Sequence, residues 1–238
     1  MTAVKSKPAR NLSGTVSVPG DKSISHRALM IGAMAVGKTV ISGLLEGDDV
    51  MRTASALELM GVRSARRENG CWCVYGRGVG GLNQPDDILD LGNSGTGARL
   101  LMGLVSTHDL TVHFTGDASL RSRPMARITD PMQEMGAQVI ARDRGRMPLV
   151  IIGANLPIPI EYRLPVPSAQ IKSAVLFAGL NTPGITRVIE TRPSRNHTEL
   201  MLQYFGADID ISDTMNGERV IKLRGQPELD ARNLIVPG

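Results

Sequence analysis

The sequence predicts an α/β (α+β) domain made of three repeated βαβαββ units, arranged with pseudo-threefold symmetry around buried helices. Three observations predict this fold. A helix that ends at a glycine and leads into a strand occurs three times, with a period of about 70 residues. An earlier helix that begins at a serine recurs with the same period. This earlier helix is apolar almost all round, which is typical of a helix inside a protein.

Glycines mark the end of the second helix of each unit. Gly61, Gly136 and Gly206 lie 75 and 70 residues apart, each after an apolar helical stretch. A glycine directly after the last helical residue is a common C-terminal signal, because it adopts the left-handed conformation at little cost. We expect the preceding helices at 49–60, 125–135 and 196–205, and the following strands at 62–65, 138–141 and 208–211.

Serines mark the start of the first helix of each unit. Ser23, Ser94 and Ser168 lie 71 and 74 residues apart, and each can cap the apolar helix that follows it. Arg27, Arg99 and Lys172 follow them by four or five residues. If the units are related by rotation, these three N-termini face one side of the domain and concentrate positive dipole ends there.

The remaining strands are predicted from β-branched content bordered by glycine or proline. They are expected at 15–18, 40–42, 71–75, 110–115, 149–152, 160–163, 186–190 and 220–223. Cys71 and Cys73 would share one face of a strand, where they do not easily form a disulfide, and no further metal ligands lie nearby in the sequence. We expect two structural thiols and neither a metal nor another cofactor.

Composition narrows the classes of partner. Aromatic residues make up only 3% of the chain, and no run of five basic residues occurs, so a nucleic-acid partner is not indicated. The net charge of +4 fits an anionic partner. The sequence contains no apolar run of about 18 residues and no signal-peptide pattern at its start, so we expect a soluble, cytoplasmic protein with no membrane contact.

The segment from Pro19 to Arg27 carries the clearest chemical signal. Lys22 lies at the expected start of a helix that Asp21 or Ser23 can cap, beside unpaired backbone N–H groups. Arg27, one turn after Ser23, can aim a two-pronged guanidinium at the same place. These residues predict an anion site, and the alternative is a capped surface helix with two solvated cations.

Four motifs, in order, resemble the 5-enolpyruvylshikimate-3-phosphate synthase family over residues 12–238. The motifs are Pro19–Arg27, Leu91–Arg99, Gly116–Met125 and Ser168–Ala174. The resemblance implies an enolpyruvyl transferase-like fold. It also implies transfer of the enolpyruvyl group of phosphoenolpyruvate to the 5-hydroxyl of shikimate 3-phosphate, with release of phosphate, in the shikimate pathway of aromatic amino-acid biosynthesis.

The resemblance also implies roles for individual residues. Lys22 would contact both substrates and is the candidate catalytic residue. Shikimate 3-phosphate would be bound by Lys22, Ser23, Arg27, Ser168, Ala169, Gln170 and Arg195. Phosphoenolpyruvate would be bound by Lys22, Gly95, Arg123 and Gln170. Ser194 could share the role of Arg195, and Gly95 could be only a turn glycine. A larger side chain at position 95 would crowd the inhibitor glyphosate, so a glycine implies that the intact enzyme is sensitive to it. His26, Arg99, Lys172 and His197 are expected to be structural.

The resemblance implies that hinge strands to a second domain lie at both ends of the chain. Residues 1–18 and 234–238 would be hinge strands, without a sheet of their own, leading to a second domain of similar build. Residues 19–233 would form the shikimate 3-phosphate-binding domain, with units at 19–83, 84–156 and 157–233. The proton-transferring acids would lie in the second domain. We therefore expect this chain to bind shikimate 3-phosphate without turnover unless a C-terminal half is supplied as partner.

The sequence disfavours two other interpretations and leaves a third open. A UDP-N-acetylglucosamine enolpyruvyl transferase would carry a reactive cysteine in a mobile loop, and no cysteine lies between Gly116 and Pro124. An RNA 3′-phosphate cyclase shares a similar repeat, but this chain has few aromatic residues and no basic stripe. A fragment that only binds a phosphorylated metabolite remains open.

Overall fold

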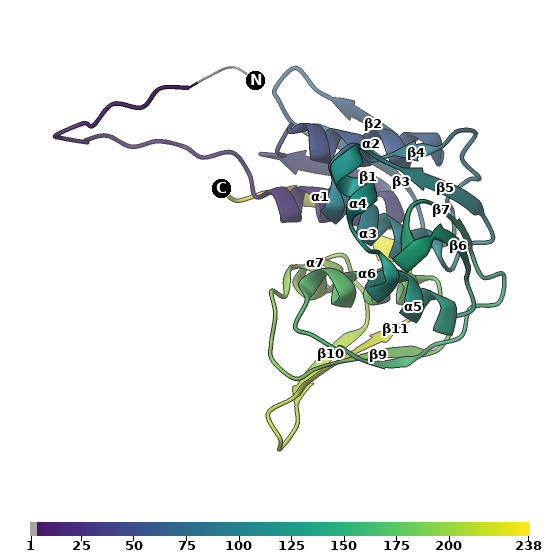
Figure 1. The fold of residues 1–238 in the computed structure, drawn as a ribbon. Helices are drawn as coiled ribbons and strands as arrows, with labels where there is room; N and C mark the ends of the chain where they lie inside the picture. The colour runs from purple at the N-terminus through teal and green to yellow at the C-terminus, as the bar shows by residue number, and fades with distance from the viewer. Residues whose placement is uncertain (1–3) are drawn as a thin grey trace.

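The computed structural model describes residues 4–238 and contains three sheets packed around central helices (Figure 1). The first unit contains α1 (Lys22–Met34), β1 (Ala35–Ser42), α2 (Asp48–Leu59), β2 (Arg63–Arg66) and β3 (Trp72–Arg77). The second contains β4 (Leu89–Asp90), α3 (Gly95–Val105), β5 (Thr111–Thr115), α4 (Ala118–Ser122), α5 (Ala126–Glu134), β6 (Gln138–Arg142), the 3₁₀ turn η1 (Asp143–Gly145) and β7 (Arg146–Ile152). The third contains β8 (Glu161–Arg163), α6 (Ala169–Leu180), β9 (Ile185–Glu190), α7 (His197–Tyr204), β10 (Ile209–Asp213) and β11 (Arg219–Arg224). Two short strands follow, β12 (Leu229–Asp230) and β13 (Asn233–Ile235).

The three sheets share one topology, which confirms the predicted repeat. In the second unit the strand order is β4-β5-β7-β6, and in the third it is β8-β9-β11-β10. In both, the short first strand pairs parallel with its neighbour and the other pairings are antiparallel. The first sheet has the equivalent order β12-β1-β3-β2. Its short parallel strand therefore comes from the far end of the chain.

The strand expected at 15–18 is absent, and this expectation was wrong. Residues 4–18 form an exposed extended arm that leaves the body of the domain (Figure 1), and Val16 is 84% exposed. The parallel neighbours of β1 are instead β12 and β13, with Ala35 opposite Leu229 and Val40 opposite Asn233. The C-terminal residues also differ from expectation. Ile235 has a sheet partner in Ser42, rather than lying in a strand without a sheet.

The helix boundaries agree closely with those predicted from glycines and serines. Gly61, Gly136 and Gly206 follow α2, α5 and α7 with φ values of 84°, 104° and 96°, as a left-handed helix end requires. Ser94 and Ser168 cap α3 and α6 through their side chains. In α1 the cap is Asp21, which accepts a hydrogen bond from the Ile24 backbone, and the helix begins at Lys22.

The first helices of the units form the core, as their apolar sequences predict. Nearly every residue of α1, α3 and α6 after the first turn is buried. Helices α3 and α6 cross at Gly103, where an added Cβ would lie 2.3 Å from the carbonyl oxygen of Ala174 and 2.6 Å from its Cα. Only a glycine permits this approach.

Most of the other predicted strands are present, some with shifted ends. Strand β1 begins at Ala35 rather than at residue 40. The two-residue strand β4 and the five-residue helix α4 were not predicted. None of the helices in residues 4–238 is long and apolar enough to cross a membrane.

Candidate functional site

The N-terminal ends of α1, α3 and α6 are tied together by side-chain hydrogen bonds. Gln170 Nε2, in the first turn of α6, donates to Thr96 Oγ1 in the first turn of α3 at 3.0 Å. Arg27 Nη2, in α1, donates to Ser173 Oγ in α6 at 2.7 Å. The predicted convergence of three helix starts is therefore present, and their unpaired N–H groups and positive dipole ends lie on one side of the domain.

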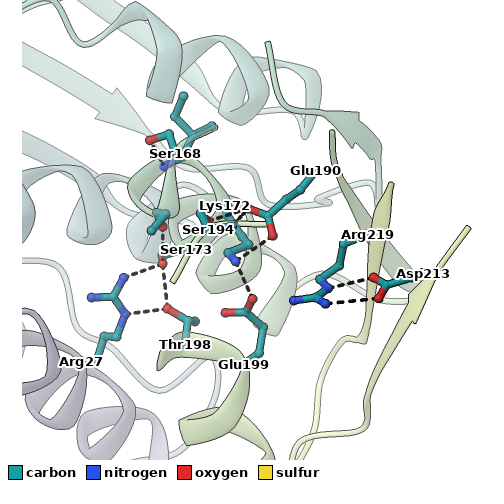
Figure 2. A network of polar contacts seen from close by, with 12 residues as sticks. Arg27, Ser168, Lys172, Ser173, Glu190, Ser194, Thr198, Glu199, Asp213 and Arg219 are labelled. Atoms are coloured by element: carbon teal, nitrogen blue, oxygen red, sulfur yellow. Dashed lines mark hydrogen bonds and ion pairs between the residues drawn. The ribbon is translucent and has the colours of Figure 1, made fainter. Parts of the chain in front are cut away.

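Arg27 lies beneath this convergence and organises the hydroxyl groups around it. Its Nη1 donates to the backbone oxygen and the Oγ of Ser23, at 2.9 and 2.6 Å. Its Nε donates to Thr198 Oγ1 at 2.6 Å, and Ser173 accepts from Nη2 (Figure 2). The side chain is only 2% exposed, and burial lowers its pKa to about 10, against the opposing effect of Glu199. Arg27 remains a cation at neutral pH and fixes the hydroxyl of Ser23.

Lys22 stands at the first position of α1 and remains accessible. Its ammonium forms an ion pair with Asp49, in the first turn of α2, and the Lys22 side chain is 51% exposed. A flexible ammonium on a half-exposed stem can leave a carboxylate for a stronger anion. The structure thus places the cation where a ligand at the helix N-terminus would meet it.

A cationic cavity of about 350 Å³ lies beside the starts of α3 and α6. Its lining includes Arg99, Arg123 and Arg127, together with Ser168 and Gln170. Burial, with a contribution from the neighbouring charge of Arg123, lowers the pKa of Arg99. Like-charged guanidinium groups repel each other unless an anion lies between them, so this cavity suits a carboxylate or a phosphate. Arg127 was not among the predicted site residues, although it follows Arg123 by four residues, in the first turn of α5.

At Gly95 an added side chain would disturb two arginines. A Cβ at this position would lie 2.7 Å from Arg123 Nη1 and 2.9 Å from Arg99 Nη1. Arg123 is oriented by Asn93 and by Ser119, which accepts from its Nη2 at 3.1 Å. Gly95 is therefore more than a turn residue, because the two guanidinium groups occupy the space that its missing side chain leaves.

Arg195 lies in the exposed loop between β9 and α7. It is close enough for its charge to contribute to lowering the pKa of Arg27. Ser194 is turned inward, where its backbone N–H donates to Glu190 Oε1 at 3.2 Å and its hydroxyl donates to the same atom. The hydroxyl of Ser194 is thus engaged within the protein, while the guanidinium of Arg195 faces solvent. Ala169 follows Ser168 as the first residue of α6.

Both cysteines are free thiols, Cys73 buried and Cys71 partly exposed. Within residues 4–238 no three His, Cys, Asp or Glu side chains are grouped as ligands for a metal ion.

Together, the repeated fold, the three converging helix starts and the arginine-lined cavity define an α/β domain with a cationic face that suits an anion. Comparison with known proteins specifies this class further. The chain belongs to the EPSP synthase (3-phosphoshikimate 1-carboxyvinyltransferase) family, whose model matches residues 6–238.

Individual relatives agree with the family. The 3-phosphoshikimate 1-carboxyvinyltransferase of Paramagnetospirillum magneticum is 58% identical over 234 residues, which are 98% of this chain and 52% of the relative. The enzyme of the same name from Rhodospirillum rubrum is 59% identical over 230 residues, 95% of this chain and 51% of the relative. A solved EPSP synthase from Acinetobacter baumannii superposes with a TM-score of 0.87 at 44% identity, covering 94% of this chain and 49% of that one. The chain thus spans about half the length of the relatives it matches.

Proposed function

We propose that this chain is the shikimate 3-phosphate-binding half of an enolpyruvyl transferase of the shikimate pathway, and that it also supplies part of the phosphoenolpyruvate site. The observation that carries the proposal is the cationic cavity at the paired N-termini of α3 and α6, with Gly95 beside it. Two anionic substrates need two adjacent cationic regions. In this domain Lys22 and Arg195 form one of them, and Arg99 and Arg123 form the other.

On the shikimate 3-phosphate side, the site offers hydroxyl groups and a helix N-terminus. Ser23 is held by Arg27, and Ser168 caps α6 next to Ala169 and Gln170. A phosphate dianion accepts hydrogen bonds from such N–H and hydroxyl groups, and Lys22 and Arg195 neutralise its charge. Each nitrogen of Arg27 donates to a group of the protein, so Arg27 orients Ser23. Its Nη2 carries a second N–H, and Arg27 stays among the residues proposed to bind shikimate 3-phosphate.

On the phosphoenolpyruvate side, Arg123 and Arg99 face the space beside Gly95. Because Gly95 has no side chain, the two guanidinium groups can lie at the start of α3, where a small anion would meet them. Gln170 lies between the two regions, since its amide reaches Thr96 in α3. Lys22, the proposed catalytic residue, would stabilise charge that develops between the two substrates.

Enolpyruvyl transfer requires a proton to be added to the methylene carbon of phosphoenolpyruvate and a proton to be removed from the 5-hydroxyl group of shikimate 3-phosphate. The new carbon–oxygen bond forms before phosphate leaves, and a proton of the resulting methyl group is lost together with phosphate to restore the methylene carbon. These proton transfers need an acid and a base at one place. The family resemblance assigns these groups to a C-terminal half. We therefore propose that the chain by itself binds substrate without turnover, and that a C-terminal half is its partner in catalysis.

Calorimetric titration of the 238-residue chain with shikimate 3-phosphate tests the site. Lys22→Ala should weaken binding by about 10-fold to 150-fold, the equivalent of one charge-assisted hydrogen bond. Lys38→Ala, which removes an exposed lysine from β1, is the matched control and should leave binding unchanged. Equal affinity of wild type and Lys22→Ala would mean that the anion binds elsewhere.

A steady-state assay of phosphate release tests whether turnover requires a C-terminal half. The chain alone should show no turnover with both substrates present, and activity should appear when a C-terminal half is added. Turnover by the chain alone at roughly 1 s⁻¹ or faster, within the ordinary range of enzymes, would contradict the proposal.

A further inference from the structure

A buried lysine lies behind the proposed substrate site, in a helix that is otherwise apolar. The side chain of Lys172 in α6 is fully buried, among neighbours such as Ile171, Ala174 and Val175. Its ammonium nitrogen lies 2.9 Å from Glu190 Oε2 and 2.6 Å from Glu199 Oε1 (Figure 2). Both carboxylates are buried as well. Such clusters seldom add stability over a well-packed apolar alternative, so their presence invites a functional explanation.

The charges around this cluster extend to Arg27, and Arg219 also lies close enough to interact with both glutamates. Lys172 supplies one positive charge against the two carboxylates of Glu190 and Glu199. Arg27 supplies the second, and the charge of Glu199 opposes the lowering of its pKa. The four groups link α1, α6, the end of β9 and the first turn of α7. The ion cluster is therefore continuous with the arginine that orients Ser23.

The two glutamates bracket the loop that carries Arg195. Glu190, the last residue of β9, accepts hydrogen bonds from the backbone and hydroxyl of Ser194. Glu199 lies in the first turn of α7, directly after Thr198. The hydroxyl of Thr198 bonds to Arg27 Nε at 2.6 Å and to Ser173 Oγ at 2.7 Å. Lys172 thus joins both ends of the segment 191–198 through a single ammonium group.

We propose that Lys172 is a positioning residue: by holding Glu190 and Glu199 it sets the segment 191–198, so that Arg195 meets the phosphate of shikimate 3-phosphate. Lys172 does not touch the substrate. This inference rests on the proposed function, since it assigns a substrate group to Arg195. It predicts that replacing Lys172 acts on binding through Arg195, and not through general loss of structure.

A double-mutant cycle on the 238-residue chain separates these two explanations. Lys172→Met is combined with Arg195→Ala, and the dissociation constant of shikimate 3-phosphate is measured for all four proteins by calorimetry. In the wild-type background Lys172→Met should weaken binding by about tenfold, whereas in the Arg195→Ala background the loss should be less than about threefold. Binding of unphosphorylated shikimate should not change with Lys172→Met.

Controls make each outcome decisive. Lys222→Met removes an exposed lysine that pairs with Asp210 on the outer face of the same unit, and it should leave binding unchanged. Should Lys172→Met fail to fold by circular dichroism, Glu199→Gln, which keeps the size of the side chain, takes its place in the cycle. The same loss in both backgrounds, or an unchanged affinity in the wild-type background, would overturn the role of Lys172. Absence of binding to the wild-type chain would instead contradict the proposed function.

Discussion

Lowering the pH should weaken the fold through one histidine that lies directly behind Lys22. His26 is fully buried in α1, and its pKa is lowered from 6.5 to about 4. Burial is the largest cause, followed by the charge of Lys22, with Asp49 acting in the opposite direction. Its Nδ1 bonds to Thr53 Oγ1 at 2.8 Å, while its buried Nε2 has no partner among the described residues. A charged imidazolium would therefore leave one N–H group without a hydrogen bond.

The sign and size of the change in stability follow from the pKa of His26 in the unfolded chain, 6.5, and in the folded chain, about 4. Above pH 6.5 the ring is neutral in both the folded and the unfolded chain, and its contribution to stability is fully present. As the pH falls toward 4, the unfolded chain binds a proton that the folded chain does not, so stability is lost. This loss amounts to about 2 kcal/mol at pH 5 and approaches about 3 kcal/mol at lower pH.

Urea unfolding of wild type and His26→Gln at pH 7 and pH 5 measures this contribution. Glutamine keeps a hydrogen-bonding group near Thr53 and does not titrate. The free energy of unfolding should fall between pH 7 and pH 5 by about 2 kcal/mol more in wild type than in the variant. His108 and His197, whose pKa values burial also lowers, titrate in both proteins and cancel in the comparison. Parallel pH profiles of the two proteins would refute the reasoning.

Two glycine substitutions test the close approaches in the structure. Gly95→Ala would press on the ends of two flexible arginine side chains, so the free energy of unfolding should change by less than about 1 kcal/mol. In enzyme completed with a C-terminal half, the same substitution should weaken inhibition by glyphosate by about tenfold or more. An unshifted inhibition curve would count against that geometry. Gly103→Ala would instead collide with the backbone of Ala174 and should cost about 3 kcal/mol in urea unfolding. Gly47→Ala is the control, because its Cβ would meet only Leu45 at 3.6 Å, and it should change the free energy of unfolding by less than about 1 kcal/mol. Similar losses of stability in the two variants would contradict the close crossing of α3 and α6 at Gly103.

The repeat could be predicted because its signals are local. A glycine that ends a helix acts through its own φ angle, and a serine that caps one acts on an N–H group three residues away. Both signals can be recognised in a short window of sequence. The apolar character of α1, α3 and α6 likewise predicted their burial without knowledge of their neighbours.

Pairings between distant segments could not be predicted in this way. Residues 15–18 have the β-branched composition of a strand, but a strand also needs a partner, and strand preference depends on that context. The partner edge of β1 is taken by β12 and β13, which contain only two and three residues. Strands this short carry too few residues for an alternating pattern to be visible.

The convergence of the helix starts could be predicted from the sequence, whereas the buried ion cluster behind them could not. Lys22, Ser168 and Gln170 lie in capping motifs, and the structure brings α1, α3 and α6 together there. The link between Lys172 and Glu190 joins residues 18 positions apart, which no local pattern reveals. The available signal was chemical. A lysine within an apolar helix needs a buried partner of opposite charge, so the position of Lys172 implies such a partner without identifying it.

The closure of the first sheet by β12 and β13 affects how the chain folds during synthesis. The second and third units contain all the strands of their own sheets and can form as they leave the ribosome. Strand β1 emerges early but remains without its parallel neighbours until Leu229 and Asn233, which follow the second and third units, have been made. Folding that depends on such distant pairings is slow and leaves a strand edge open to wrong partners in the meantime. Of the three units, the first is therefore the last to be completed, because its sheet closes only when β12 and β13 pair with β1.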